Sequence, residues 1–364
     1  MDRAPLHHRI LSKDVGLWGV PVRAGLRAIE VGYAAAIALR NAHYDGNGPR
    51  AVLPVPVISV GNVTAGGTGK TPLVIELLER LGRMGCNPVV VSRGYKAHDG
   101  GANDEERLIR CHVPGAICLS SSNRMEAGEA AIQSHRADVI VLDDAFQHRQ
   151  LGRTLDIVLV DATCPFGFDH LLPRGLLREP LEALRRADAI VLTRCDQVSP
   201  QELARVEARI RSFHDTAKII KCKHRVTKLQ SLGGLPVDEP PDGKRAVLFA
   251  GIGRPGAFAE TVRGMGVEVV GERWWPDHHA YVSKDWSALV GAHRFPQHDW
   301  LMTTEKDAVK LVGLSGTEGA GIVVVRVAID FEGDGGTMLQ SLLESVLRKG
   351  WKGLMVHGAN LQTG

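Results

Sequence analysis

A glycine-rich run at residues 64–71, TAGGTGKT, has the residue types that hold the phosphates of a nucleotide. Glycines let backbone N–H groups converge on phosphate oxygens, because they carry no Cβ that would clash. Lys70 can reach the β- and γ-phosphates, and the Thr71 hydroxyl can ligate Mg²⁺. The generic motif begins with glycine where this chain has Thr64, but the glycines that follow still meet the physical need. The candidate nucleotide-binding residues are Thr64, Ala65, Gly66, Gly67, Thr68, Gly69, Lys70 and Thr71.

Two adjacent carboxylates, Asp143 and Asp144, follow the apolar run VIVL at residues 139–142. An acidic residue at the end of a buried strand beside a phosphate loop typically holds Mg²⁺. Asp143 is the first candidate and Asp144 the second. Because neighbouring side chains on a strand point to opposite faces, we expect the two to differ in role. His148 follows in the same loop and is expected near the phosphates.

Several further charged residues stand in loops after predicted strands. Arg93, in the run SRGY, can contact phosphate. Arg178 can stabilise charge on a transferring group, with Arg124 as the alternative, and Glu179 can join the metal ligands. Each of these charges, taken alone, is also typical of a solvated surface.

Short apolar runs alternate with helical patterns and must position these residues. We expect strands at residues 56–60, 88–92, 139–142, 157–160 and 190–192, and a helix at 70–84. After a stretch rich in Gly, Pro and acidic residues at 231–244, we expect strands at 246–250, 267–270, 300–303 and 322–327, and helices at 255–265 and 338–347. This rhythm predicts an α/β fold of the P-loop NTPase type, a mostly parallel sheet flanked by helices, with a smaller α/β C-terminal domain. In such sheets ligands bind at the carboxyl ends of the strands.

The length of 364 residues suggests about two domains. We predict a P-loop core domain at residues 1–228, a smaller C-terminal domain at 229–350 and a tail at 351–364. The core domain includes an amphipathic helix at about residues 15–40, in which apolar residues recur at helical spacing. This helix either packs on its own domain or lies on a membrane surface.

Composition excludes several classes of protein. The formal net charge of +3 is too mild for a nucleic-acid-binding protein, so no nucleic-acid partner is expected. The six cysteines are scattered without a CxxC pair, which indicates reduced thiols and no zinc site. We expect no signal peptide, and no transmembrane helix, since a span needs about 20 mostly apolar residues.

Four motifs in order, VGNVTAGGTGKTP, SRGY, LDDAFQHRQL and LPRGLLREP, resemble the tetraacyldisaccharide 4'-kinase family of lipid A biosynthesis. AGIGRPGAF, PDHHAY and TTEKDAVK extend the resemblance, which covers roughly residues 50–330. It implies transfer of the ATP γ-phosphoryl group, with Mg²⁺, to the 4'-hydroxyl of a tetraacylated glucosamine disaccharide 1-phosphate. It also implies a peripheral protein on the cytoplasmic side of the bacterial inner membrane, which the N-terminal helix touches, and an active site between the two domains.

The resemblance also implies a catalytic pair, Asp104 and His278. Lys70 and Arg178 are the other catalytic candidates, because their charges can offset that of the transferring group. Asn103 stands where the family more often has glycine. A carboxylate–imidazole pair can orient a sugar hydroxyl and take its proton as the new bond forms. Without the resemblance His279 is an equal candidate. The candidate substrate-binding residues are Arg93, Tyr95, Arg124 and His148.

Two alternative functions have no lipid acceptor. One is a P-loop switch ATPase, which does not need PDHHAY near its phosphates. The other is a GTPase that acts as an assembly factor, because Thr193-Arg194-Cys195-Asp196 follows a strand as a guanine-reading motif does. Arg194 in place of lysine weakens that interpretation, and a comparison of ATP with GTP discriminates the two.

Overall fold

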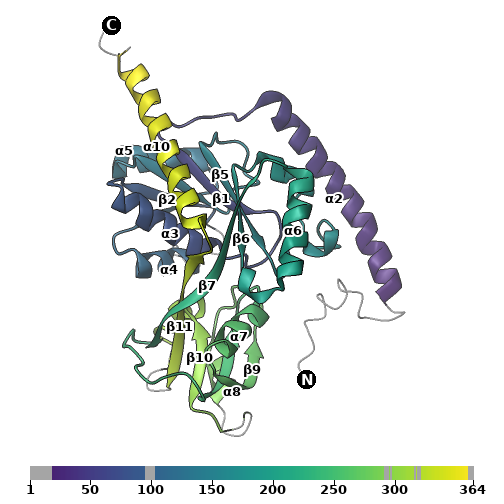
Figure 1. Ribbon diagram of the computed structural model, residues 1–364, viewed down its shortest axis with the longest axis vertical. Helices are drawn as coiled ribbons and strands as arrows, with labels where there is room; N and C mark the ends of the chain where they lie inside the picture. The colour runs from purple at the N-terminus through teal and green to yellow at the C-terminus, as the bar shows by residue number, and fades with distance from the viewer. Residues whose placement is uncertain are drawn as a thin grey trace.

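A single eleven-stranded sheet runs through the molecule in the order β3-β2-β4-β1-β5-β6-β7-β11-β10-β8-β9 (Figure 1). The structure is a computed structural model that describes residues 19–94, 103–290, 295, 297–314, 317 and 321–359. Neighbouring strands pair in parallel throughout, except that β7 and β11 are antiparallel. The predicted fold class, a mostly parallel sheet flanked by helices, is confirmed.

The first half of the molecule comprises strands β1 to β6 and their helices. Its strands are β1 (Val57–Asn62), β2 (Pro88–Ser92), β3 (Ile117–Ser120), β4 (Val139–Asp143), β5 (Leu155–Asp161) and β6 (Ala189–Thr193). Its helices are α2 (Gly19–Asn47), α3 (Lys70–Arg83), α4 (Asp104–His112), α5 (Arg124–His135) and α6 (Pro200–Phe213), with short 3-10 turns at Gly167–Asp169, Leu181–Arg186 and Cys195–Gln197. Strands β1, β4, β5 and β6 are buried along their whole length, as continuous apolar runs require.

The second half comprises strands β8 to β11 with helices α7 to α9. Its elements are β8 (Arg245–Ala250), α7 (Pro255–Arg263), β9 (Glu268–Trp274), α8 (Ser283–Val290), β10 (Trp300–Thr304), α9 (Glu305–Leu311) and β11 (Ile322–Phe331). The long strand β7 (Lys218–Ser231) joins the halves. Its first residues pair in parallel with β6, and its remaining residues pair antiparallel with β11.

The last helix, α10 (Gly335–Ala359), returns to the first half (Figure 1). Leu339 and Leu343 lie in the same hydrophobic core as Leu73 and Leu77 of α3. Arg80 Nη1 also donates to the carbonyl of Gly336 at 2.8 Å. The predicted division into two domains at residue 228 stays a prediction. It places most of α10 in the C-terminal domain, whereas α10 packs on α3 of the first half. Most of the predicted tail belongs to α10.

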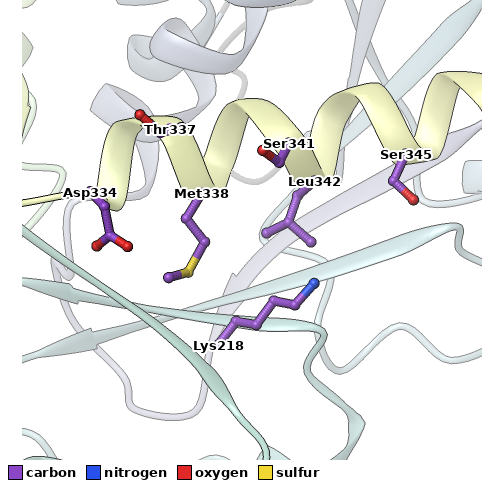
Figure 2. Close-up of a pocket in the computed structure, with 7 residues that line it drawn as sticks. All are labelled: Lys218, Asp334, Thr337, Met338, Ser341, Leu342 and Ser345. Atoms are coloured by element: carbon purple, nitrogen blue, oxygen red, sulfur yellow. The ribbon is translucent and has the colours of Figure 1, made fainter.

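A pocket of about 310 Å³ lies between α10 and the start of β7 (Figure 2). Met338 and Leu342 point toward Lys218 across it. None of the predicted site residues lines this pocket. It therefore plays no part in the site described below.

Helix α2 lies along the outside of the first half (Figure 1). Its inner face is anchored, because Tyr33 Oη donates to the carbonyl of Arg178 at 2.9 Å and Arg174 pairs with Glu30 at 3.0 Å. Its outer face leaves Val31 and Leu39 exposed. The helix thus packs on its own half, while part of its apolar surface stays uncovered. Within the described residues, no helix is long and apolar enough to cross a membrane.

Candidate active site

Polar residues gather where five adjacent strands of the first half end. These residues are Ser92 on β2, Asp143 on β4, Asn62 on β1, Asp161 on β5 and Thr193 on β6. Asn62 Nδ2 donates to the carbonyl of Thr64 at 2.7 Å and to Thr68 Oγ1 at 3.1 Å, so the end of β1 holds the loop that follows. The candidate site therefore lies at the carboxyl edge of the sheet, as the sequence predicts.

The phosphate loop connects β1 to α3, which begins at Lys70. Gly66 and Gly69 have φ angles of 112° and 91°, in the region that favours glycine. A Cβ added at Gly66 would contact nothing within 4 Å, so the loop is open there. Open backbone amides at a helix N-terminus suit an anion, which fits the phosphates of a nucleotide.

Two residues of the run TRCD brace the phosphate loop. Arg194 Nη2 donates to the carbonyl of Gly67 at 3.1 Å, and Thr193 Oγ1 donates to the carbonyl of Thr68 at 3.0 Å. Arg194 Nη1 also pairs with the buried Asp161 at 2.5 Å. Sequence reasoning considered these residues only as a guanine-reading motif and missed the bracing, which depends on the neighbouring strand.

Asp143 and Asp144 have opposite electrostatic environments. The pKa of Asp143 is raised to about 7, mainly by burial and also by nearby Glu105, against the pull of Lys70. Burial would also raise the pKa of Asp144, but Lys70 and Arg178 outweigh it and hold that pKa at about 2. Arg178 Nη1 lies 2.9 and 3.0 Å from the two oxygens of Asp144, and Lys70 Nζ lies 3.5 Å from Oδ1. The expected difference in role between the two carboxylates thus has a physical basis.

The chemistry of this edge suits a magnesium ion. Oδ1 of Asp143 is buried and accepts no hydrogen bond from the described part of the chain. The described residues contain no group of three or more His, Cys, Asp or Glu side chains placed to hold a metal. A small protein ligand set is what Mg²⁺ takes at phosphate sites, where substrate oxygens and water complete the coordination.

The predicted arginines near this edge lie in different positions. Arg124 is buried, and its Nη2 donates to the carbonyls of Asp143 and Asp144 at 3.1 and 2.9 Å. It therefore holds the acidic loop rather than presenting its charge outward. Arg93 is exposed beyond β2. Tyr95 lies outside the described residues.

His148 lies among arginines. Its pKa is lowered to about 4, mainly by burial and also by the charges of Arg124, Arg153, Arg93 and Arg40. The imidazole is therefore neutral near pH 7 and surrounded by positive charge. Such a cluster favours an anionic ligand.

Glu179, a predicted metal ligand, has protein partners on both of its oxygens. The side chain is fully buried, and its oxygens accept from Arg40, Asn41 and Arg186 at 3.3, 3.2 and 2.8 Å. These partners occupy both oxygens. The geometry therefore gives Glu179 the role of joining α2 to the first half, and it offers no support for metal binding.

Asp104 and His278 come together from opposite halves, with His278 Nδ1 3.6 Å from Asp104 Oδ2. Asp104 opens α4, and Asn103 caps that helix by accepting from the backbone N–H of Glu106 at 2.8 Å. The departure at Asn103 is thus a good helix cap. Burial would raise the pKa of Asp104, but His278 and two lysines outweigh it and lower that pKa.

Helix α9 supplies groups that sequence reasoning missed. Lys306 Nζ lies 3.2 Å from Asp277 Oδ1 and 3.2 Å from His278 Nε2. Lys310 Nζ lies 3.9 Å from Asp104 Oδ2. Both lysines belong to the run TTEKDAVK, which carried only the resemblance, and nothing in their spacing indicates that α9 packs against α4.

The turn at Gly253 brings the second half against the phosphate loop. A Cβ added at Gly253 would lie 2.7 Å from the backbone nitrogen of Gly67 and 3.2 Å from Asp277 Oδ2. The loop, Gly253 and Asp277 are therefore packed together, and Asp277 in turn contacts Lys306. This chain of contacts connects the phosphate loop to His278.

Known proteins resemble this chain along most of its length. The family model described as tetraacyldisaccharide-1-P 4'-kinase matches residues 22–347. The chain belongs to the tetraacyldisaccharide 4'-kinase family. A tetraacyldisaccharide 4'-kinase from Anaeromyxobacter dehalogenans strain 2CP-C is 38% identical over 335 residues, which are 86% of this chain and 88% of that protein. One from Chlorobium luteolum is 36% identical over 351 residues, 89% of this chain and 97% of that protein.

A solved structure of this kinase family has the same fold. It is described as the apo form of LpxK from Aquifex aeolicus in complex with ATP, with a TM-score of 0.67 and 28% identity. The match covers 90% of this chain and 99% of that chain. The sequence-based recognition of the tetraacyldisaccharide 4'-kinase family is confirmed. Because the similarity includes both halves, a switch ATPase or a GTPase assembly factor is not favoured.

Proposed function

We propose that this chain transfers the γ-phosphoryl group of ATP to the 4'-hydroxyl of a tetraacylated glucosamine disaccharide 1-phosphate, where its two halves meet. One observation carries the proposal. The phosphate loop and the carboxylates Asp143 and Asp144 lie on the first half. His278 of the second half lies 3.6 Å from Asp104 of the first. Membership of the tetraacyldisaccharide 4'-kinase family makes the chain an ATP-dependent kinase of lipid A biosynthesis.

The phosphate loop binds the nucleotide. Residues 64–71 present backbone N–H groups to the phosphates, and Lys70 neutralises charge on them. Thr71 and Asp143 would hold Mg²⁺, which when bound offsets the charge of the phosphate oxygens. Asp143 is the better ligand of the two carboxylates, since Asp144 is already paired with Lys70 and Arg178.

Asp104 and His278 act on the acceptor hydroxyl. They orient it and receive its proton as the oxygen attacks the γ-phosphorus. Asp144 keeps Lys70 and Arg178 side by side, so that two positive charges face the group in transfer. The positive charge around His148 offers a site for an anionic part of the acceptor, with the exposed Arg93 as its contact and the buried Arg124 contributing only its field.

The outer face of α2 suits the surface of a membrane. Val31 and Leu39 are 64% and 74% exposed there. An acceptor with four acyl chains stays partly in a bilayer, so a peripheral position at the cytoplasmic side of the inner membrane brings the site to it. The double variant Val31→Ser/Leu39→Ser should bind lipid vesicles less than the wild type. Leu235→Ser, at a position 71% exposed on the second half, is the matched control. Equal binding of all three proteins would contradict the membrane role.

The kinase activity is tested with labelled ATP and the disaccharide 1-phosphate lipid. Wild-type protein should yield a product with a second phosphate, and GTP should serve less well. His278→Ala should lower the rate by about 10²–10⁴-fold, the usual contribution of general acid–base catalysis. Lys70→Ala should lower it by at least about 10²-fold. The exposed Lys284, changed to alanine, serves as the control. Nucleotide hydrolysis without labelled lipid would favour the switch ATPase instead.

A further inference from the structure

Lys306 of α9 contacts the nitrogen of His278 that faces away from Asp104. Its Nζ lies 3.2 Å from His278 Nε2, 3.2 Å from Asp277 Oδ1 and 3.8 Å from Glu105 Oε1. The side chain is largely buried where α4 and α9 meet. No step proposed above uses this residue.

Lys306 carries a positive charge at neutral pH. Burial alone would lower its pKa, but Asp277 and Glu105 outweigh that effect and raise it. A charged ammonium has three donors and no acceptor. Lys306 can therefore only donate to His278.

The state of His278 follows from that contact. A neutral imidazole has one donor and one acceptor nitrogen, and the hydrogen bond at one nitrogen fixes the state of the other. Nε2 faces a donor, so it must accept, and the proton lies on Nδ1. Nδ1 is the atom 3.6 Å from Asp104 Oδ2.

One neighbour would favour the opposite tautomer. Asp277 Oδ2 lies 3.9 Å from His278 Nε2 and can accept a proton from it. That is the longer of the two contacts at Nε2, since Lys306 Nζ lies 3.2 Å from both Nε2 and Asp277 Oδ1. Nε2 therefore accepts a hydrogen bond from Lys306, and Lys306 also holds Asp277 through its ion pair.

We propose that Lys306 is a positioning residue that holds His278 as the Nδ1–H tautomer and so directs its N–H to Asp104. This role in catalysis rests on the proposed kinase function. With Nδ1–H facing one oxygen of Asp104 across 3.6 Å, the imidazole orients the carboxylate, whose free lone pairs can receive the proton of the acceptor hydroxyl. Removal of Lys306 leaves Asp277 as the polar neighbour of Nε2, which favours the Nε2–H tautomer and turns the donor away from Asp104.

The tautomer can be measured directly in the full chain by ¹⁵N-histidine NMR near pH 7.5. Long-range ¹H–¹⁵N correlations distinguish the protonated from the unprotonated ring nitrogen, and the spectrum of His278→Asn assigns the signals by difference. Wild-type protein should show Nδ1 protonated. Lys306→Met should move the population to Nε2–H, while Lys306→Arg, which keeps donors at this position, should retain Nδ1–H.

Lys310→Met is the matched control, because Lys310 lies near the same carboxylate and does not contact His278. It should leave the tautomer unchanged. In the lipid assay Lys306→Met should lower kcat by at least about tenfold with little change in KM for ATP, since a histidine in the wrong tautomer cannot orient its partner.

Two outcomes would overturn the proposal: protonated Nε2 in the wild type, or Nδ1–H retained in a folded Lys306→Met. The wild-type spectrum decides even if that variant fails to fold. The NMR measurement uses neither ATP nor lipid. A chain without kinase activity would therefore refute the proposed function and leave the tautomer result standing.

Discussion

The contact between Gly253 and the phosphate loop makes a sharp prediction about Gly253→Ala. The new Cβ would lie 2.7 Å from the nitrogen of Gly67, closer than real Cβ atoms approach backbone. Gly67 cannot simply retreat, because Arg194 holds its carbonyl at 3.1 Å. The second half must therefore move away from the loop. Overpacking of this kind costs about 1–3 kcal/mol, which corresponds to roughly a 5- to 150-fold loss in kcat/KM.

The matched control for this prediction is Gly256→Ala, in the first turn of α7. An added Cβ there meets nothing within 4 Å. Alanine is also the better helix former by about 1 kcal/mol, so this variant should be fully active and at least as stable as the wild type. Both variants are assayed for phosphoryl transfer and for thermal unfolding. Full activity of Gly253→Ala would refute the inference that this close approach is part of the working site, and so would an equal loss in Gly256→Ala.

Two further predictions concern buried charges. The pKa of Asp143 is raised to about 7 in the folded protein, so the folded chain holds this proton more tightly than the unfolded chain does. The resulting stabilisation is complete below about pH 4 and is lost as the pH rises through 7. Asp143→Asn should therefore stabilise the protein more at pH 8 than at pH 5 in urea unfolding. Asp144→Asn should show no such change between these values, since the pKa of Asp144 is held at about 2. Arg194→Met should lower the free energy of unfolding by about 3 kcal/mol, because the buried Asp161 then keeps the longer ion pair with Arg254 at 3.5 Å and the hydrogen bonds from Thr163, but loses its closest cation. The exposed Arg263, changed in the same way, should cost less than about 1 kcal/mol.

The fold could be predicted wherever the chain buries continuous apolar residues. Strand β2 has the predicted bounds, and the apolar runs at residues 139–142 and 157–160 lie within β4 and β5. Strand β7 was missed, because its charged residues interrupt the apolar pattern in KIIKCKHRVTKLQS. Helix α4 was missed as well, since it is short and rich in charge. Its position depends on contacts with α9 that only the folded chain provides.

The site divides in the same way. The phosphate loop and the acid pair are contiguous in sequence, so their chemistry could be predicted from residue types alone. The pair of Asp104 and His278 needed a family resemblance, because two distant segments must meet to form it. Glu179 follows Arg178 directly, yet its carboxylate turns to Arg40 and Arg186. Adjacency in sequence does not determine the direction of a side chain, and packing against α2 decides it here.

Strand β7 has a mechanical consequence for the molecule. It is hydrogen-bonded to β6 at one end and to β11 along the rest, so the two halves are joined by continuous sheet. A change in the orientation of the two halves therefore requires twisting of this strand, because no flexible linker separates them here. His224 lies midway along it, with its ring about 3 Å from where a Cβ on Gly69 would be. The conformation of β7 and the shape of the phosphate loop are thus coupled through the contact between His224 and Gly69. A substitution at His224 should change both.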